Sequence, residues 1–172
     1  MNFNYRGYIP ADFNDSSRVW IYQANRRFSP EEAADIEPML KQFVAAWASH
    51  GEKVKGFAQL FFNHFIVLMA DETATGVSGC STDSSVRLMK EIEQHLEVQL
   101  FDRQLLAFIL DEDIRLMPLT ELNQAVNGNL LNADTLYFNN TVLSKKELLE
   151  SWITPVKNSW LGKRIERKEM SS

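Results

Sequence analysis

Residues 55–70 read KGFAQLFFNHFIVLMA, two strand-like runs separated by Asn63 and His64. Both runs, 55–62 and 65–70, are rich in aromatic and aliphatic residues, which is typical of strands that pack on a core. Asn and His tolerate positive φ angles better than most residues, so the pair between the runs predicts a two-residue hairpin turn. We therefore expect an antiparallel hairpin near the middle of the chain.

The segment before this hairpin predicts a strand followed by a helix. Residues 18–24 (RVWIYQA) are β-branched and aromatic, as in a strand. Ser29 then precedes Pro30, and Glu32 completes a capping box, which together mark a helix start. We expect Pro38 to kink or restart this helix and the pair at 50–51, His-Gly, to end it.

The segment after the hairpin predicts a second helix, starting near Ser81 or Thr82, and a further strand over residues 105–110. The resulting order, β-α-β-β-α-β, is that of a ferredoxin-like fold. The sequence thus predicts an α+β protein with a ferredoxin-like core over residues 18–110 and an α/β elaboration over 111–165. An irregular N-terminal arm over 1–17 and a frayed tail over 166–172 complete a predicted single domain, residues 1–172.

Composition limits the classes of function. The chain has 172 residues, of which 45% are hydrophobic and 24% charged, which is ordinary for a globular protein. Its net charge of −5 argues against a nucleic-acid partner. The lone cysteine, Cys80, excludes an intrachain disulfide and zinc sites built from several thiolates. We expect no membrane span and no secretory signal, and hence a cytoplasmic location.

A polar loop over residues 71–85 is the first candidate site. It follows a predicted strand and runs into a predicted helix start, where unpaired N–H groups and the helix dipole favour anions. We therefore predict that a small anionic or phosphate-bearing ligand binds over residues 76–85. The residues expected to contact it are Gly76, Ser78, Gly79, Ser81, Thr82, Ser84 and Ser85.

The same loop allows other interpretations. A helix start lowers the pKa of a thiol, so Cys80 is a candidate nucleophile of a thiol-dependent enzyme. Asp71, Glu72 and Asp83 are weak candidates for a divalent cation, since Mg²⁺ and Ca²⁺ prefer oxygen ligands. A capped helix with a small buried cysteine explains the same residues without any site. A third function, a homodimeric interaction or scaffold protein, rests on the open sheet of the fold class.

Two catalytic motifs do not fit the loop. A P-loop needs GxxxxGK[ST], and the spacing of Gly76 and Gly79 is wrong and no lysine follows. A cysteine phosphatase needs five residues between its cysteine and arginine, whereas six separate Cys80 from Arg87.

Four segments resemble a family of uncharacterised bacterial proteins whose members often carry the label ABC transporter ATPase. They are residues 19–25 (VWIYQAN), 57–85 (around FFNHFIVLMADETATGVSGCSTDSS), 101–104 (FDRQ) and 136–143 (LYFNNTVL). The resemblance covers residues 17–165, and its most specific part is the string GVSGCSTDSS. It implies no established activity, and the motifs of an ABC ATPase are absent from the sequence.

Overall fold

The computed structural model describes residues 1–73 and 79–169, with side chains for 1–73 and 82–166. The protein is α+β, with helices and small antiparallel sheets. It divides into two compact units. The larger unit comprises Asn2–Asp102 and Val142–Leu149, and the smaller one Arg103–Thr141 and Glu150–Ser172 with Met1. The predicted single domain is not tested by this division and stays a prediction.

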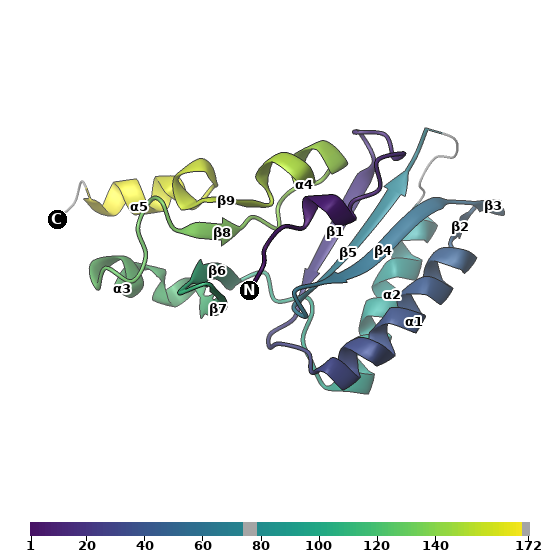
Figure 1. Ribbon diagram of the computed structural model, residues 1–172, viewed down its shortest axis with the longest axis horizontal. Coiled ribbons are helices and arrows are strands. Elements are labelled where there is room, and N and C mark those ends of the chain that lie inside the picture. Colours follow the sequence, from purple (N-terminus) through teal and green to yellow (C-terminus); the bar gives the residue numbers. More distant parts are fainter. Residues whose placement is uncertain (74–78, 170–172) are drawn as a thin grey trace. The chain divides into compact units, whose positions relative to one another are not determined.

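The larger unit is built on a three-stranded antiparallel sheet with the order β1-β5-β4 (Figure 1). The predicted strand at 18–24 forms as β1, and the central hairpin forms as β4 and β5, so both predictions are confirmed. The elements of this unit are η1 (Arg6–Tyr8), β1 (Arg18–Gln23), α1 (Pro30–Ala46), β2 (Ala48–Ser49), β3 (Glu52–Lys53), β4 (Lys55–Phe61), β5 (Phe65–Asp71), α2 (Gly79–Leu96) and the start of α4 (Lys145–Ser151).

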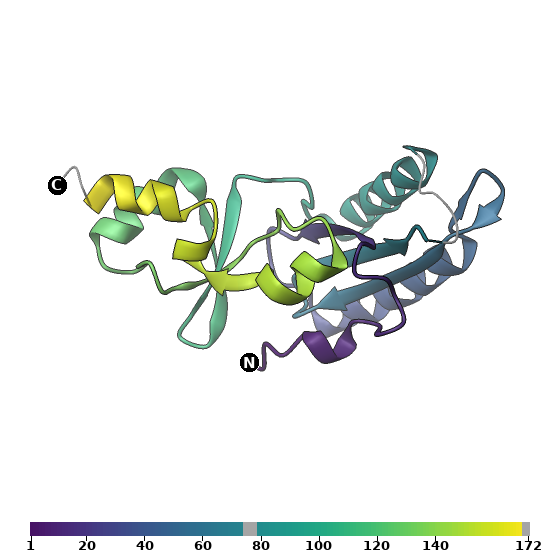
Figure 2. The ribbon, with the colours of Figure 1, turned by 90° about the horizontal axis from the view of Figure 1, so that it is seen from above.

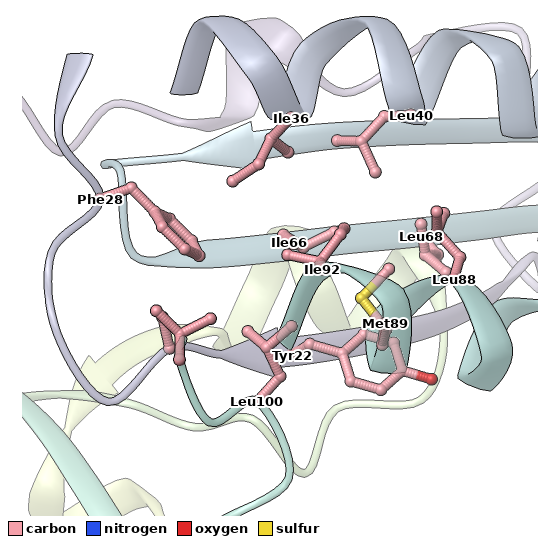
Figure 3. Packing of buried hydrophobic residues seen from close by; sticks show 12 residues of the cluster. Tyr22, Phe28, Ile36, Leu40, Ile66, Leu68, Leu88, Met89, Ile92 and Leu100 are labelled. Carbon is pink, nitrogen blue, oxygen red and sulfur yellow. The ribbon is translucent and has the colours of Figure 1, made fainter. Parts of the chain in front are cut away.

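The helices α1 and α2 cover one face of this sheet, as Figures 1 and 2 show from two directions. Their buried side chains meet those of the strands in one cluster (Figure 3). Ile36 and Leu40 of α1 point toward Ile66 of β5, and the cluster continues through α2. The α2 members and the remaining labelled residues are Leu88, Met89, Ile92, Tyr22, Phe28, Leu68 and Leu100.

The N-terminal arm packs on the other face of the sheet through aromatic pairs. Phe13 meets Phe57 with ring centroids 6.5 Å apart, and Tyr8 meets Phe61 at 6.4 Å. Phe57 and Phe61 alternate along β4 with the residues that face the helices, as the period of a strand requires. The arm therefore completes the second layer of the core, although it contains little regular structure.

The start of α1 is as predicted, but its end is not. Ser29 Oγ accepts from the backbone N–H of Glu32, and Glu32 accepts from the backbone N–H of Ser29, so the capping box is confirmed. The helix runs past Pro38 without restarting and ends at Ala46. The pair at 50–51 is instead the turn of the β2–β3 hairpin, with φ angles of +52° and +80°. The helix ends early because Trp47, its C-cap, leaves helical geometry to bury its indole.

The hairpin turn between β4 and β5 lies one residue earlier than predicted. Phe62 and Asn63 have φ angles of +55° and +52°, whereas Asn63 and His64 were expected in the turn. The carbonyls of Asn63 and His64 accept hydrogen bonds from the backbone N–H groups of Phe28 and Ala24, at 2.7 and 2.8 Å. These contacts with the β1–α1 connection fix the turn.

The predicted strand over 105–110 forms as β6 (Leu105–Leu110) but does not join β1. It pairs with β7 (Asp113–Pro118) and β8 (Leu136–Phe138) in another sheet. The free edge of β1 is occupied by the chain before α4, since Val19 N donates to Leu143 O at 3.0 Å and Lys145 N to Ser17 O at 2.9 Å. The four-stranded sheet of a ferredoxin-like core is therefore not formed among the described residues.

The smaller unit contains the four-stranded antiparallel sheet β7-β6-β8-β9, with β9 at Ile153–Pro155. Its other elements are η2 (Leu119–Glu121), α3 (Leu122–Asn127), η3 (Val156–Asn158) and α5 (Gly162–Glu169). Phe108 and Tyr137 of the sheet share a core with Leu122 of α3 and Ile165 of α5. Among the helices of the described residues, none is long and apolar enough to cross a membrane.

Candidate functional site

A cleft of about 460 Å³ opens between α1 and α2 in the larger unit. Each helix contributes four residues at the spacing i, i+3, i+4, i+7, which places them on one side of the helix. The lining residues are Met39, Gln42, Phe43 and Ala46 from α1, Ser84, Arg87, Leu88 and Glu91 from α2, and Trp47 and Ala48 from the segment after α1. This volume lies within the range of small-molecule sites.

The cleft lies at one end of the helix pair because the other end is tied together. Arg26 makes two parallel hydrogen bonds to Glu32 near the start of α1, with N–O distances of 2.7 and 2.8 Å. The same guanidinium donates to the backbone carbonyl of Leu96, the last residue of α2, at 2.8 Å. The end of α1 and the first half of α2 are thus left to line the cleft.

The floor of the cleft is apolar and closely packed. Trp47 is only 2% exposed and packs against Phe43 and Trp20, with ring centroids 4.9 and 5.8 Å apart. Gly56 of β4 lies against the same indole, where a Cβ would come within 2.6 Å of Trp47 Cε3. Because core packing holds this wall in place, the floor is a pre-formed surface for an apolar group.

The rim of the cleft carries unpartnered polar groups. Gln42, Arg87 and Glu91 are exposed and line the cleft. Across residues 1–73 and 82–166, no hydrogen bond or ion pair involves any of these three side chains. A guanidinium carries five N–H donors in a fixed plane, which suits a carboxylate or a phosphate. Arg87 is therefore the group of the cleft best suited to an anion.

Of the predicted anion-binding residues, Ser84 is the one that the described structure places in the lining of the cleft. Ser84 lines it and is half-buried. Ser85 is fully buried, and its Oγ donates to the backbone carbonyl of Thr82 at 2.6 Å, so this hydroxyl is committed to the helix. Gly79, Cys80 and Ser81 belong to the first turn of α2, but their side chains lie outside the described residues. Gly76 and Ser78 lie outside them entirely.

The three acidic candidates for a metal do not come together. Asp83 is exposed on α2. Glu72 forms an ion pair with Arg18, with 3.6 Å between Glu72 Oε1 and Arg18 Nε. Asp71 Oδ1 accepts from the hydroxyl and backbone N–H of Thr73, and its Oδ2 accepts from the backbone N–H of Asn14 at 3.0 Å. No group of three or more metal-ligating side chains is found within the described part of the chain.

These contacts give Asp71 a structural role. The hydroxyl of Thr73 contributes most, with the N–H groups of Asn14 and Thr73, to lowering the pKa of Asp71 to about 2. The charge of Lys55 lowers the pKa of Asp71 by a smaller amount, and its Nζ lies 3.9 Å from Asp71 Oδ2. Asp71 therefore anchors the N-terminal arm at the end of β5 as a buried carboxylate.

Sequence reasoning missed most of the cleft. Helical spacing in the sequence predicts one buried face of α1 with Ile36, Leu40, Phe43, Val44 and Trp47, and Ile36, Leu40 and Trp47 are buried. Met39, which was not predicted, continues an apolar stripe with Phe43 and Trp47 at four-residue spacing. Such an extra stripe is more than one core face requires, and this was the available signal.

Comparison with known proteins gives no match to a family model, to a curated protein or to a solved structure. The resemblance to a bacterial family stays a prediction, as do the thiol-dependent reaction at Cys80, the homodimer and the cytoplasmic location.

Proposed function

We propose that this protein binds a small organic anion in the cleft between α1 and α2. The apolar part of the ligand lies on Phe43, Trp47 and Leu88, and its anionic group binds Arg87. The observation that carries the proposal is an arginine that has no partner among the described residues and lies at the rim of an apolar floor. Charged rim groups of this kind fix the orientation of ligands in mostly apolar pockets.

This proposal refines the anion site predicted over residues 76–85. Ser84 belongs to both the predicted site and the cleft, and it lies three residues before Arg87 on the same side of α2. The guanidinium of Arg87 thus lies one helical turn from the predicted site and supplies it with a charged donor. A phosphate, a sulfonate or a carboxylate meets this requirement.

The test uses the aromatic sulfonate 8-anilinonaphthalene-1-sulfonate, whose fluorescence reports an apolar site. We expect saturable binding to the folded protein at one site, weakened about tenfold in Arg87→Gln, as for the loss of one charge-assisted hydrogen bond. The matched control is Lys90→Gln, which removes an exposed cation from the same helix outside the cleft. Equal affinity in both variants, or no saturable binding, would contradict the proposal.

A further inference from the structure

The rim of the cleft carries a negative group as well as a positive one. Arg87 and Glu91 lie on the same side of α2, one turn apart, and both line the cleft. A side-chain pair at this spacing interacts most favourably with the acidic residue first, and here the arginine comes first. Neither side chain makes an ion pair with another described residue. Both charges are therefore available to a ligand.

Among anionic ligands, this charge pattern favours one that also carries a cation. An anionic group bound to Arg87 lies within a few ångströms of Glu91, and like charges at such a distance repel. A ligand with a cation beside its anion removes this cost and satisfies Glu91 as well. The rim is thus complementary to a zwitterion.

The spacing and the polar groups indicate the size of that zwitterion. Side chains at i and i+4 of a helix have Cβ atoms about 5–6 Å apart. An extended peptide covers at most about 3.3–3.6 Å per residue, so the termini of a dipeptide are up to about 7 Å apart, which the long side chains of Arg87 and Glu91 can span from these positions. Gln42, on the opposite helix, offers an amide donor and acceptor for one peptide group.

From this we infer that the cleft binds a short apolar peptide of dipeptide size with free termini. Its carboxylate pairs with Arg87, its ammonium group with Glu91, and its side chains lie on Phe43 and Trp47. The inference rests on the proposed function, because it assigns the ligand class of the same cleft.

The test is calorimetric titration of the full chain with three probes: the dipeptide Leu-Phe, its N-acetyl form and its C-terminal amide. We expect the free dipeptide to bind about tenfold more tightly than either capped form, the order of one lost charge-assisted contact. In Glu91→Gln the partner of the ammonium group is missing, so we expect the free and the N-acetylated dipeptides to bind equally. In Arg87→Gln the partner of the carboxylate is missing, so we expect the free dipeptide and its C-terminal amide to bind equally. Glu37→Gln, an exposed position on α1 outside the cleft, keeps the wild-type preference.

The outcomes separate the two proposals. If N-acetyl-Leu-Phe binds as tightly as the free dipeptide and Glu91→Gln changes nothing, the cleft takes anions and the inference of a zwitterion is wrong. If none of the three peptides binds while the aromatic sulfonate does, the peptide class is wrong and the anion site stands. If neither the peptides nor the sulfonate bind, both proposals fail.

Discussion

Gly56 of β4 lies against the indole of Trp47, where an added Cβ would be 2.6 Å from Cε3 and 3.0 Å from Cζ3. Real Cβ atoms do not approach other carbons so closely, so only glycine fits beneath this ring. The contact joins the core sheet to the floor of the proposed binding cleft. The contact also explains why β4 has a glycine in its interior, where a glycine otherwise weakens a strand.

We expect Gly56→Ala to lower the free energy of unfolding by about 1–3 kcal/mol, the usual cost of overpacking a core. Trp47 is almost fully buried and packs against Phe43 and Trp20, so its ring is held against Gly56. Denaturant unfolding measures the effect. The matched control is Gly7→Ala, because nothing lies within 4 Å of a Cβ at that position. Equal losses in the two variants would show that Trp47 yields easily.

Lys145 is a buried lysine that holds the N-terminal arm. Its Nζ donates to the backbone carbonyl of Phe13 at 2.7 Å and lies 3.4 Å from that of Ala11. Lys145→Met removes the donor and leaves a buried carbonyl without its partner, so we expect a loss of about 1–3 kcal/mol in the free energy of unfolding. Lys146→Met, at the exposed neighbouring position, is the control. Equal free energies of unfolding in the two variants would show that the contact of Lys145 with the N-terminal arm does not stabilise the fold.

Ser17 presents the opposite case. Its Oγ is buried and has no hydrogen-bond partner among the described residues. A buried hydroxyl without a partner is destabilising, so we expect Ser17→Ala to keep the unfolding free energy or to raise it by up to about 1 kcal/mol. Ser16→Ala is the control, since the exposed Ser16 Oγ donates to Asn14 Oδ1 at 2.7 Å. A clear loss of stability in Ser17→Ala would mean that its hydroxyl has a partner in solution.

Acid is expected to destabilise the larger unit through two carboxylates. Arg26 contributes most to lowering the pKa of Glu32 to about 2, and the hydroxyl of Thr73 does the same for Asp71, also to about 2. Both values lie below those of the unfolded chain, so these groups stabilise the fold above about pH 4–5. The stabilisation is lost as the pH falls toward 2.

Measuring the free energy of unfolding between about pH 6 and pH 2 checks this dependence. In Asp71→Asn we expect a lower stability at neutral pH and a shallower fall in acid, because the variant has one such carboxylate fewer. Asp83→Asn, on the exposed side of α2, should keep the neutral-pH stability of the wild type. An Asp71→Asn profile that runs parallel to the wild type would exclude this carboxylate as a cause.

Elements specified by neighbouring residues could be predicted from the chain alone. Ser29 and Glu32 form their capping box within four residues, and dense β-branched, aromatic and aliphatic runs mark β1 and β5 as strands. The acidic pair Asp111 and Glu112 forms the two-residue turn between β6 and β7, with φ angles of +52° and +60°. Short-range hydrogen bonds and side-chain periodicity encode such features directly.

Partners distant in sequence required the folded chain. The apolar run LLAFIL at 105–110 predicts a strand, but not which strand edge it pairs with, since backbone hydrogen bonds carry no sequence signal. The edge of β1 is taken instead by the chain at the start of α4, where Leu143 O accepts from Val19 N and Lys145 N donates to Ser17 O. The cleft likewise depends on residues far apart in the sequence, since Phe43 lies on α1 and Arg87 on α2. The packing of both helices on one face of the sheet brings the apolar floor close to a charge that has no partner among the described residues.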